Sequence, residues 1–306
     1  MTRRLRWWWF LAPLLGVSVL LLDRPRSAKA THQAEWLEAG DVKVRTVRAG
    51  FGDTTIFLLH GYGETLLTWR AVFDPLALQH PVIAVDVPGF GGSDKPDRPY
   101  TLDVQVERLS RFLDRWTKGP VIVVGHSMGG ELAAALALAR PERVVAAVLI
   151  APAGLGVGLA GLVDSVTDSR AEALGWYLAS RSFLLPDHDP DWLGEVGRRA
   201  SYSLMTDEAY RRAAARVLRE FDFRALRHRL KDLKQPTLVI WGELDPVIPY
   251  ALSAILESEL PCSRLVTLED ALHRPQVERP DTVIAEIRAF VAKPECGGAG
   301  NSAPTH

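Results

Sequence analysis

Residues 121–130 read VIVVGHSMGG, and the rest of the chain is interpreted outward from this segment. Four apolar β-branched residues, Val121–Val124, predict a buried strand, and the alanine- and leucine-rich run Glu131–Arg140 predicts a helix. Between them, Gly125-His126-Ser127-Met128-Gly129 matches the pattern G-x-S-x-G. On a strand–turn–helix this pattern indicates a nucleophilic serine on a tight turn that admits only small residues two places to either side. A serine that merely caps a helix is the alternative interpretation.

Buried strands and amphipathic helices alternate on both sides of this segment. The expected strands span 41–48, 55–59, 81–85, 144–150, 237–241 and 264–268, and the expected helices span 66–78, 102–118, 252–259 and 280–292. This alternation predicts an α/β fold with a mostly parallel central sheet and helices on both faces. In such sheets the functional site lies just beyond the carboxyl ends of the strands.

A serine hydroxyl needs a base, and the base needs an orienting carboxylate. Asp245 follows the strand over 237–241, and His273 follows the strand over 264–268. With Ser127 they give the chain order Ser, Asp, His, which predicts a catalytic triad. The rival carboxylate Glu243 lies closer to its strand end. The neighbouring histidines fit less well, because His126 cannot turn back to the hydroxyl of Ser127 and His60 is expected to brace its own loop.

An oxyanion formed during acyl transfer needs two N–H donors. The first expected donor is the backbone of Met128, directly after the serine. The second is the backbone of Tyr62 in His60-Gly61-Tyr62-Gly63, whose glycines let the chain approach a substrate. As substrate-contacting residues we name Gly61, His126 and Trp176.

The alternation of strands and helices stops after residue 153. Residues 154–234 predict a helical cap inserted between two parts of the core, 31–153 and 235–293, and residues 294–306 predict a flexible tail. The cap is rich in aromatic residues, which suits a lipid-like or aryl ester substrate. The alternative is that these aromatic residues only hold the cap on the core.

Residues 1–30 differ from the rest of the chain. Three arginines precede an apolar run over 7–22, which predicts an N-terminal membrane anchor. We therefore expect attachment to the inner membrane, with the remaining chain facing the periplasm. A signal peptide cleaved after Ala28-Lys29-Ala30 is the alternative, and it would give a secreted or periplasmic protein. A buried N-terminal helix is a third interpretation.

The composition excludes several classes of function. The 306 residues carry a net charge of −1, so no basic field points to nucleic acid. Neither a phosphate-binding loop nor a dinucleotide fingerprint occurs, and no Cys/His cluster has metal-ligand spacing, so no cofactor or metal is expected. Cys262 and Cys296 could pair in an oxidising compartment. Cys296 lies in a glycine-rich tail, which argues against pairing, and the sequence leaves the question open.

Together, these motifs resemble the α/β-hydrolase fold family, serine hydrolase branch. The segments that carry the resemblance are His60–Gly63, Asp86–Asp94, Gly125–Gly130, Trp241–Asp245 and His273 with Glu278–Pro280. Leu272 departs from the pattern, since the family usually has glycine directly before the histidine.

Within this family the chain is similar to membrane-associated esterases of the monoacylglycerol-lipase type. The resemblance implies cleavage of carboxylic esters through an acyl-enzyme, without a cofactor. It leaves open C–C bond hydrolysis of ring-cleavage diketones and cofactor-free perhydrolysis with the same triad. A non-catalytic binding module is the alternative of a different class.

Overall fold

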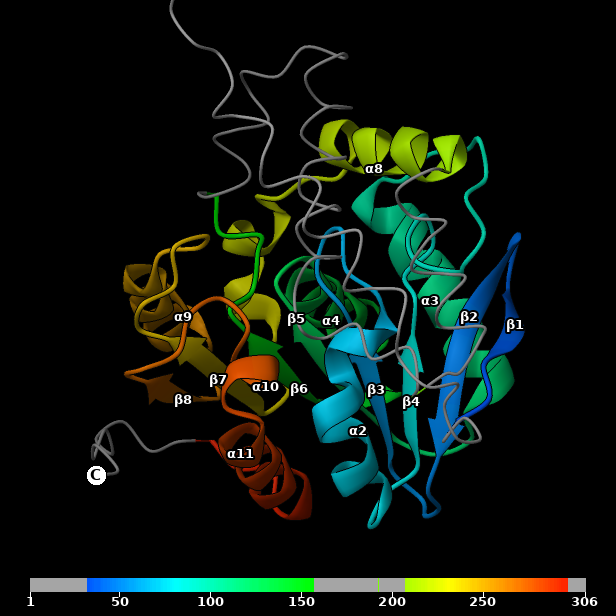
Figure 1. Ribbon diagram of the computed structural model, residues 1–306. Helices are drawn as coiled ribbons and strands as arrows, with labels where there is room; N and C mark the ends of the chain where they lie inside the picture. Colours follow the sequence, from blue (N-terminus) through cyan, green and yellow to red (C-terminus); the bar gives the residue numbers. More distant parts are fainter. Residues whose placement is uncertain (1–31, 157–191, 193–206, 297–306) are drawn as a thin grey trace, which may run out of the picture.

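The computed structural model describes residues 32–156, 192 and 207–296. Its centre is an eight-stranded sheet with the strand order β1-β2-β4-β3-β5-β6-β7-β8 (Figure 1). In chain order the strands are β1 Glu35–Ala39, β2 Val42–Ala49, β3 Thr55–Leu59, β4 Val82–Val85, β5 Val121–His126, β6 Val144–Ile150, β7 Thr237–Gly242 and β8 Ser263–Leu268.

Strands β3 to β8 run parallel, whereas β2 is antiparallel to both β1 and β4. The predicted α/β fold with a mostly parallel sheet is therefore confirmed. The central strands β3, β4 and β5 are buried at every position. This burial on both faces explains why they read as continuous apolar runs rather than as alternating patterns.

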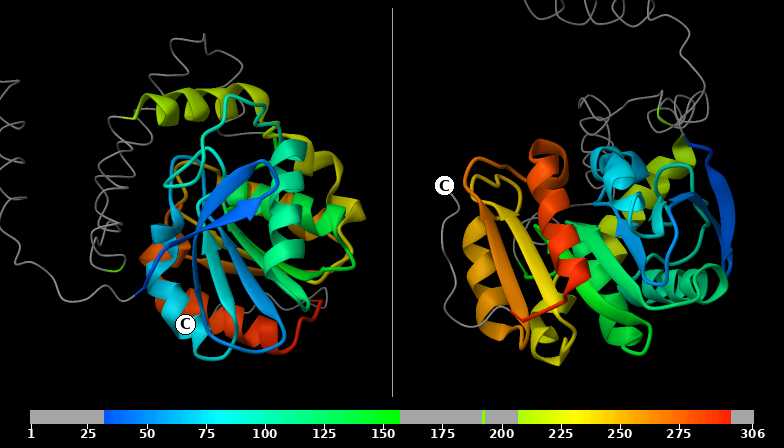
Figure 2. Two further views of the ribbon diagram at one scale, coloured as in Figure 1. Left: turned by 90° about the vertical axis from the view of Figure 1, so that its right-hand side faces the viewer. Right: turned by 90° about the horizontal axis from the view of Figure 1, so that it is seen from below.

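Helices cover both faces of the sheet (Figure 2). In chain order they are α2 Arg70–Ala77, α3 Leu102–Trp116, α4 Met128–Ala139, α8 Glu208–Glu220, α9 Ser253–Glu259, α10 Pro275–Glu278 and α11 Pro280–Ala292, with short 3₁₀ turns η1 Leu66–Trp69, η2 Ala225–His228, η3 Leu230–Asp232 and η4 Tyr250–Leu252. Helices α3, α4 and α9 share one apolar core with the sheet, and α2 and α11 share the other. Both layers hold the ends of the central strands in fixed positions.

Several element boundaries differ from the sequence expectations. The helix expected over 66–78 divides into η1 and α2, and α4 begins at Met128 rather than Glu131. Strand β1 and helix α10 were not expected. Strand β1 is a short edge strand in which exposed Trp36 and Glu38 alternate with buried Leu37 and Ala39. It joins β2 through a turn at Gly40, where φ is +70°.

Most of the predicted cap, 154–234, lies outside the described residues, and so does Trp176. The described part includes α8, which lies across the carboxyl ends of the strands in Figure 1. The Tyr62 hydroxyl donates to the Ala214 carbonyl oxygen at 3.0 Å, and the Tyr210 hydroxyl donates to that of Gly63 at 3.3 Å. Helix α8 is thus fixed to the loop that follows β3.

The two cysteines form a disulfide, Cys262–Cys296, across 34 positions of sequence. The glycine-rich tail had argued against this pairing, but α11 returns the chain to the beginning of β8 before that tail starts. The predicted anchor over 1–30 lies outside the described residues, as does the tail beyond residue 296. Within the described ranges, no helix is both long enough and apolar enough to cross a membrane.

Candidate active site

Ser127 occupies the sharp turn between β5 and α4. Its backbone has φ 54° and ψ −119°, a conformation that L residues rarely adopt. The turn is possible only because its neighbours are glycines. A Cβ on Gly125 would lie 1.9 Å from the Gly129 carbonyl oxygen, and one on Gly129 would lie 2.1 Å from that of Leu59. The expected strand, tight turn and helix are therefore all present.

The structure brings together the three residues of the predicted triad, which come from loops after β5, β7 and β8. His273 Nε2 lies 3.1 Å from Ser127 Oγ, and His273 Nδ1 lies 2.8 Å from Asp245 Oδ2. The imidazole is thus held between a hydroxyl and a carboxylate. This geometry is the one that a nucleophile, its base and the orienting acid require.

Asp245 has four hydrogen-bond donors around its carboxylate. Besides His273, Trp241 Nε1 donates to Oδ2 at 3.2 Å, and the N–H groups of Val247 and Ile248 donate to Oδ1 at 2.8 and 2.9 Å. Burial raises the pKa of Asp245, but these bonds and the charge of His273 outweigh it, so the pKa lies below its usual value. The group is an ionised acceptor. The rival Glu243 is exposed.

His273 is suited to accept a proton near neutral pH. Burial lowers its pKa below the ordinary value, and nearby His126 acts in the same direction, while the hydrogen bond and charge of Asp245 oppose them. Glu278 fixes the loop by accepting from the N–H groups of Leu272 at 2.5 Å and Arg274 at 3.2 Å. Leu272 replaces the usual glycine without conflict because its side chain is 47% exposed.

Two backbone N–H groups, those of Tyr62 and Met128, are the expected oxyanion donors. Neither has a hydrogen-bond acceptor within the part of the chain that the structure describes. The Tyr62 loop lies beside the nucleophile, since a Cβ on Gly61 would lie 3.1 Å from Ser127 Cβ. The buried Tyr62 side chain packs against Phe90 and Ala214, so only its backbone is available to a substrate. The oxyanion hole itself remains a prediction.

The structure buries His126, which we expect to contact the substrate. Its side chain is 1% exposed, and both ring nitrogens have partners within the protein: Nδ1 lies 3.0 Å from Glu64 Oε2, and Nε2 lies 2.7 Å from the His273 carbonyl oxygen. No polar atom of the ring is left for a substrate. His60 braces its own loop as expected, since Nδ1 lies 2.8 Å from the Gly61 carbonyl oxygen, and its Nε2 accepts from the Val87 N–H of the loop after β4 at 2.9 Å.

Glu64 is a buried residue beside the triad that the sequence does not single out. It is buried, and its carboxylate contacts Gly61 in the loop after β3, His126 at the end of β5 and Arg274 in the loop after β8. A single acidic residue after His60-Gly61-Tyr62-Gly63 gives no signal in the sequence. Its role depends on contacts that arise only when the strand ends assemble.

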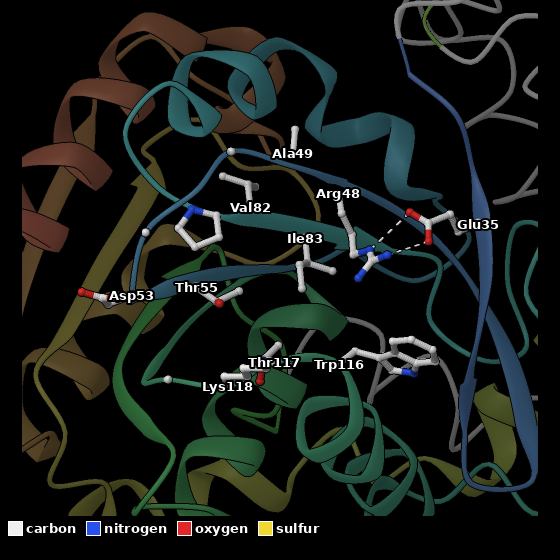
Figure 3. A pocket seen from close by; sticks show the side chains of 14 residues that line it. Glu35, Arg48, Ala49, Asp53, Thr55, Val82, Ile83, Trp116, Thr117 and Lys118 are labelled. Atoms are coloured by element: carbon white, nitrogen blue, oxygen red, sulfur yellow. Dashed lines mark hydrogen bonds and ion pairs between the residues drawn. The ribbon is translucent and has the colours of Figure 1, made fainter.

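Figure 3 shows a cavity of about 710 Å³ whose lining contains no residue of the triad. It is lined by the starts of β3 and β4 and by the end of α3, so it opens at the edge of the sheet opposite Ser127. Arg48 pairs there with Glu35 at 2.6 Å, beside the ring of Trp116. No histidine, serine or cysteine lines this cavity, which does not suit it for nucleophilic chemistry. Among the described residues, no cluster of side chains could hold a metal ion.

Residues 54–280 match the family described as the alpha/beta hydrolase fold. This chain belongs to the α/β-hydrolase fold family. Among solved structures, this α/β hydrolase is similar to a membrane phospholipase A described as a bacterial virulence factor. The TM-score is 0.70 at 24% identity, covering 93% of this chain and 92% of the other. That likeness concerns the fold.

Three curated relatives indicate the range of chemistry around this hydrolase. The dihydrolipoyllysine-residue acetyltransferase component of the acetoin cleaving system of Cupriavidus necator is 32% identical, over 85% of this chain and 69% of that protein. A pimeloyl-acyl-carrier-protein methyl ester esterase of Aeromonas hydrophila is 29% identical, over 82% and 100%. The 2-hydroxy-6-oxo-6-(2'-aminophenyl)hexa-2,4-dienoic acid hydrolase of Metapseudomonas resinovorans is 30% identical, over 87% and 93%.

Proposed function

We propose that this α/β hydrolase cleaves carboxylic esters through an acyl-enzyme formed on Ser127. One observation carries the proposal: His273 lies within hydrogen-bond distance of both Ser127 Oγ and the Asp245 carboxylate. This is the arrangement that makes a serine hydroxyl nucleophilic at neutral pH. The esterase of Aeromonas hydrophila supports the choice of ester substrates.

In the proposed first half-reaction, His273 Nε2 takes the proton of Ser127 as Oγ bonds to the ester carbonyl carbon. The N–H groups of Tyr62 and Met128 stabilise the resulting oxyanion. The C–O bond to the alcohol then breaks, and His273 returns its proton to the leaving oxygen. Asp245 keeps Nδ1 protonated and stabilises the imidazolium in between.

In the second half-reaction, water takes the place of the alcohol. His273 accepts a proton from water as the water oxygen bonds to the acyl carbon. The bond to Ser127 Oγ then breaks, and the serine recovers its proton from His273. The products are the carboxylic acid and the alcohol, and no cofactor takes part.

The test is turnover of p-nitrophenyl esters by the full chain and by a Ser127→Ala variant. We expect Ser127→Ala to lower kcat by at least about 10⁴-fold, because the triad acts as a unit. A fluorophosphonate probe should label the wild-type protein and not the variant. Turnover that survives the substitution, or a wild-type protein that takes no label, would overturn the proposal.

C–C bond hydrolysis is the second candidate, supported by the relative from Metapseudomonas resinovorans. The same triad can assist water addition to a vinylogous diketone. A series of esters with acyl chains of two to sixteen carbons, compared with a ring-cleavage diketone, separates the two. Higher kcat/KM for the long-chain esters would support the lipid-like substrate class. A preference for the diketone would replace the ester assignment.

We also propose that residues 1–30 attach the enzyme to a membrane, with the catalytic part on the outer side. The disulfide Cys262–Cys296 supports an oxidising compartment, and the basic and apolar sequence of the segment supports attachment. Retention of the full chain in the membrane fraction after a salt wash is the expected result. A mature product that begins at Thr31 would support a cleaved signal peptide instead.

A further inference from the structure

Glu64 connects three parts of the active site. Its Oε2 accepts from the Gly61 N–H at 2.9 Å and lies 3.0 Å from His126 Nδ1, and its Oε1 lies 2.8 Å from Arg274 Nε. Gly61 precedes the expected oxyanion donor Tyr62, His126 precedes the nucleophile, and Arg274 follows the base. One buried carboxylate thus contacts a residue next to each of these groups.

The partners of His126 fix the protonation of its ring. Nδ1 faces the Glu64 carboxylate and Nε2 faces the His273 carbonyl oxygen at 2.7 Å. Burial raises the pKa of Glu64, but the charges of His126 and Arg274 and two hydrogen bonds hold it well below its usual range. The Arg274 guanidinium beside Oε1 and the Gly61 N–H donated to Oε2 are the partners of an ionised carboxylate. An ionised carboxylate and a carbonyl oxygen can only accept, so both ring nitrogens of His126 must donate.

We propose that Glu64 and His126 form a buried carboxylate–imidazolium pair that positions His273 through its backbone carbonyl and places a fixed positive charge beside its ring. The two imidazole rings lie 4.8 Å apart between centroids. The pair touches no reacting atom, so both members are positioning residues. The inference rests on the catalytic role of Ser127 and His273 proposed above.

The charges around the two rings determine the direction of the effect. Glu64 and Arg274 face His126, while Asp245 and Ser127 face His273. The negative charge of Glu64 also acts on His273 and opposes the charge of His126, but more weakly. A cation beside His273 disfavours a positive charge on the His273 ring, so His273 stays neutral down to a lower pH. Removing that cation should make His273 easier to protonate.

The first experiment measures the pH dependence of kcat/KM in a His126→Asn variant. Asparagine keeps a polar side chain but removes the charge, so the acidic limb should move to higher pH by about one unit. Glu131→Gln is the control for substitution at a buried polar residue: it removes no cation, so the acidic limb of its pH profile should stay in place. An unchanged acidic limb in His126→Asn would overturn the charge effect.

The second experiment separates positioning from general damage to the fold. In Glu64→Gln, the side-chain amide has one oxygen that can accept hydrogen bonds, whereas the carboxylate of Glu64 accepts them on two oxygens. We expect kcat to fall about 10- to 100-fold, while KM changes less than about threefold. The double variant Glu64→Gln/His126→Asn should lose little more than the worse single variant, because the two act as a unit. Additive losses would contradict the pair.

The third experiment does not depend on activity. Nitrogen-15 NMR of the full chain labelled at histidine should show two N–H groups for His126 at neutral pH, assigned by their loss in His126→Asn. A single N–H would overturn the imidazolium assignment even in a fully active enzyme. Conversely, two N–H groups in a protein that lacks Ser127-dependent turnover would leave the pair intact and overturn only the proposed function.

Discussion

At the scale of single residues, Ser127 bears the backbone strain of the site. It is one of two described residues other than glycine with positive φ, the other being Ala151 at 41°. Such conformations cost about 1–3 kcal/mol each and persist where surrounding structure enforces them. Here the enforcement comes from β5 and α4, and from the Ser127 N–H bond to the Ile150 carbonyl oxygen at 2.9 Å.

The strain predicts a difference between two inactive variants. Ser127→Gly places a residue that tolerates positive φ at the turn, whereas Ser127→Ala keeps the Cβ that makes the turn costly. We expect the glycine variant to be more stable than the alanine variant by about 1 kcal/mol, after glycine's greater unfolded-state entropy is subtracted. Urea denaturation of both proteins measures the difference. Equal midpoints would mean that the turn stores no free energy.

The second prediction at this scale concerns pH. Burial lowers the pKa of His273 below the ordinary 6.5, so its neutral, basic form persists to lower pH. The kcat/KM of ester hydrolysis should therefore be constant above pH 7 and fall only as pH drops through that lowered value. Two esters with different leaving groups should give the same midpoint pH, because the midpoint then reflects the ionisation of a group of the enzyme and not of the substrate. A midpoint above 6.5 would contradict the prediction.

At the scale of elements, helix α4 both follows the nucleophile and buries an acidic side chain. Its fourth residue, Glu131, is fully buried against Gly154 and Leu226, below the chain that leads from α8 to β7. Neither carboxylate oxygen has a well-formed hydrogen bond within the described residues. Burial raises the pKa of Glu131 well above its usual value, and Asp222 adds to the effect. Burial in the helix thus favours the neutral form of this acid.

This acid predicts a stability that depends on pH. Because the folded-state pKa is raised, the stabilisation is complete below the unfolded value of 4.5 and is lost as pH rises toward the folded value. The free energy of unfolding of Glu131→Gln should equal that of the wild type near pH 4. Above pH 4 it should exceed the wild-type value by up to about 1.4 kcal/mol for each pH unit. Urea midpoints from pH 4 to 8.5 measure this, with exposed Glu243→Gln as the control. A constant difference across that range would refute it.

The comparison of elements shows what the sequence alone could predict. Buried strands such as β5 and long amphipathic helices such as α3 were recognised because their apolar patterns are continuous and periodic. Strand β1 and the single-turn helix α10 were missed, because short elements with polar residues depend on their neighbours for stability. The start of α4 was placed late because Gly129 and Gly130 are weak helix formers. In the structure these glycines serve close packing.

At the scale of the whole molecule, the disulfide fastens the end of α11 to the beginning of β8. It joins Cys262 and Cys296 across 34 positions, so it restricts a segment that contains His273. A cross-link over a loop of this size stabilises by about 2–4 kcal/mol, chiefly by limiting the unfolded chain. The triad does not contact the sulfur atoms.

We therefore expect Cys296→Ser to lower Tm by about 5–10 °C while kcat stays near the wild-type value. Reduction of the wild-type protein with dithiothreitol should lower Tm by the same amount and should have no effect on the variant. Calorimetry with and without reductant gives both values. An equal response of both proteins to reductant would show that this disulfide is not the source of the stability.

Across the whole molecule, the site divides into a part that sequence reveals and a part that it does not. Ser127, Asp245 and His273 follow recognisable strands in a recognisable order. The contacts of Glu64 and the proposed charge of His126 depend on a pair more than sixty positions apart in sequence, one in a loop and one at the end of β5, and no local pattern encodes them. The same distinction applies to Cys296, whose partner depends on where α11 ends.

Strands β6 and β7 are adjacent in the sheet and paired from Ala147↔Thr237 to Ile150↔Ile240, although a long stretch of chain separates them in sequence. The pairing of β6 with β7 therefore does not depend on that stretch. The stretch begins where β6 ends, at the carboxyl edge of the sheet beside Ser127. A replacement of different length could be grafted between these two strands without altering any strand pairing. Any such replacement would have to keep the hydrogen bonds from Tyr62 to Ala214 and from Tyr210 to Gly63, because they fix helix α8 to the loop that carries the expected oxyanion donor.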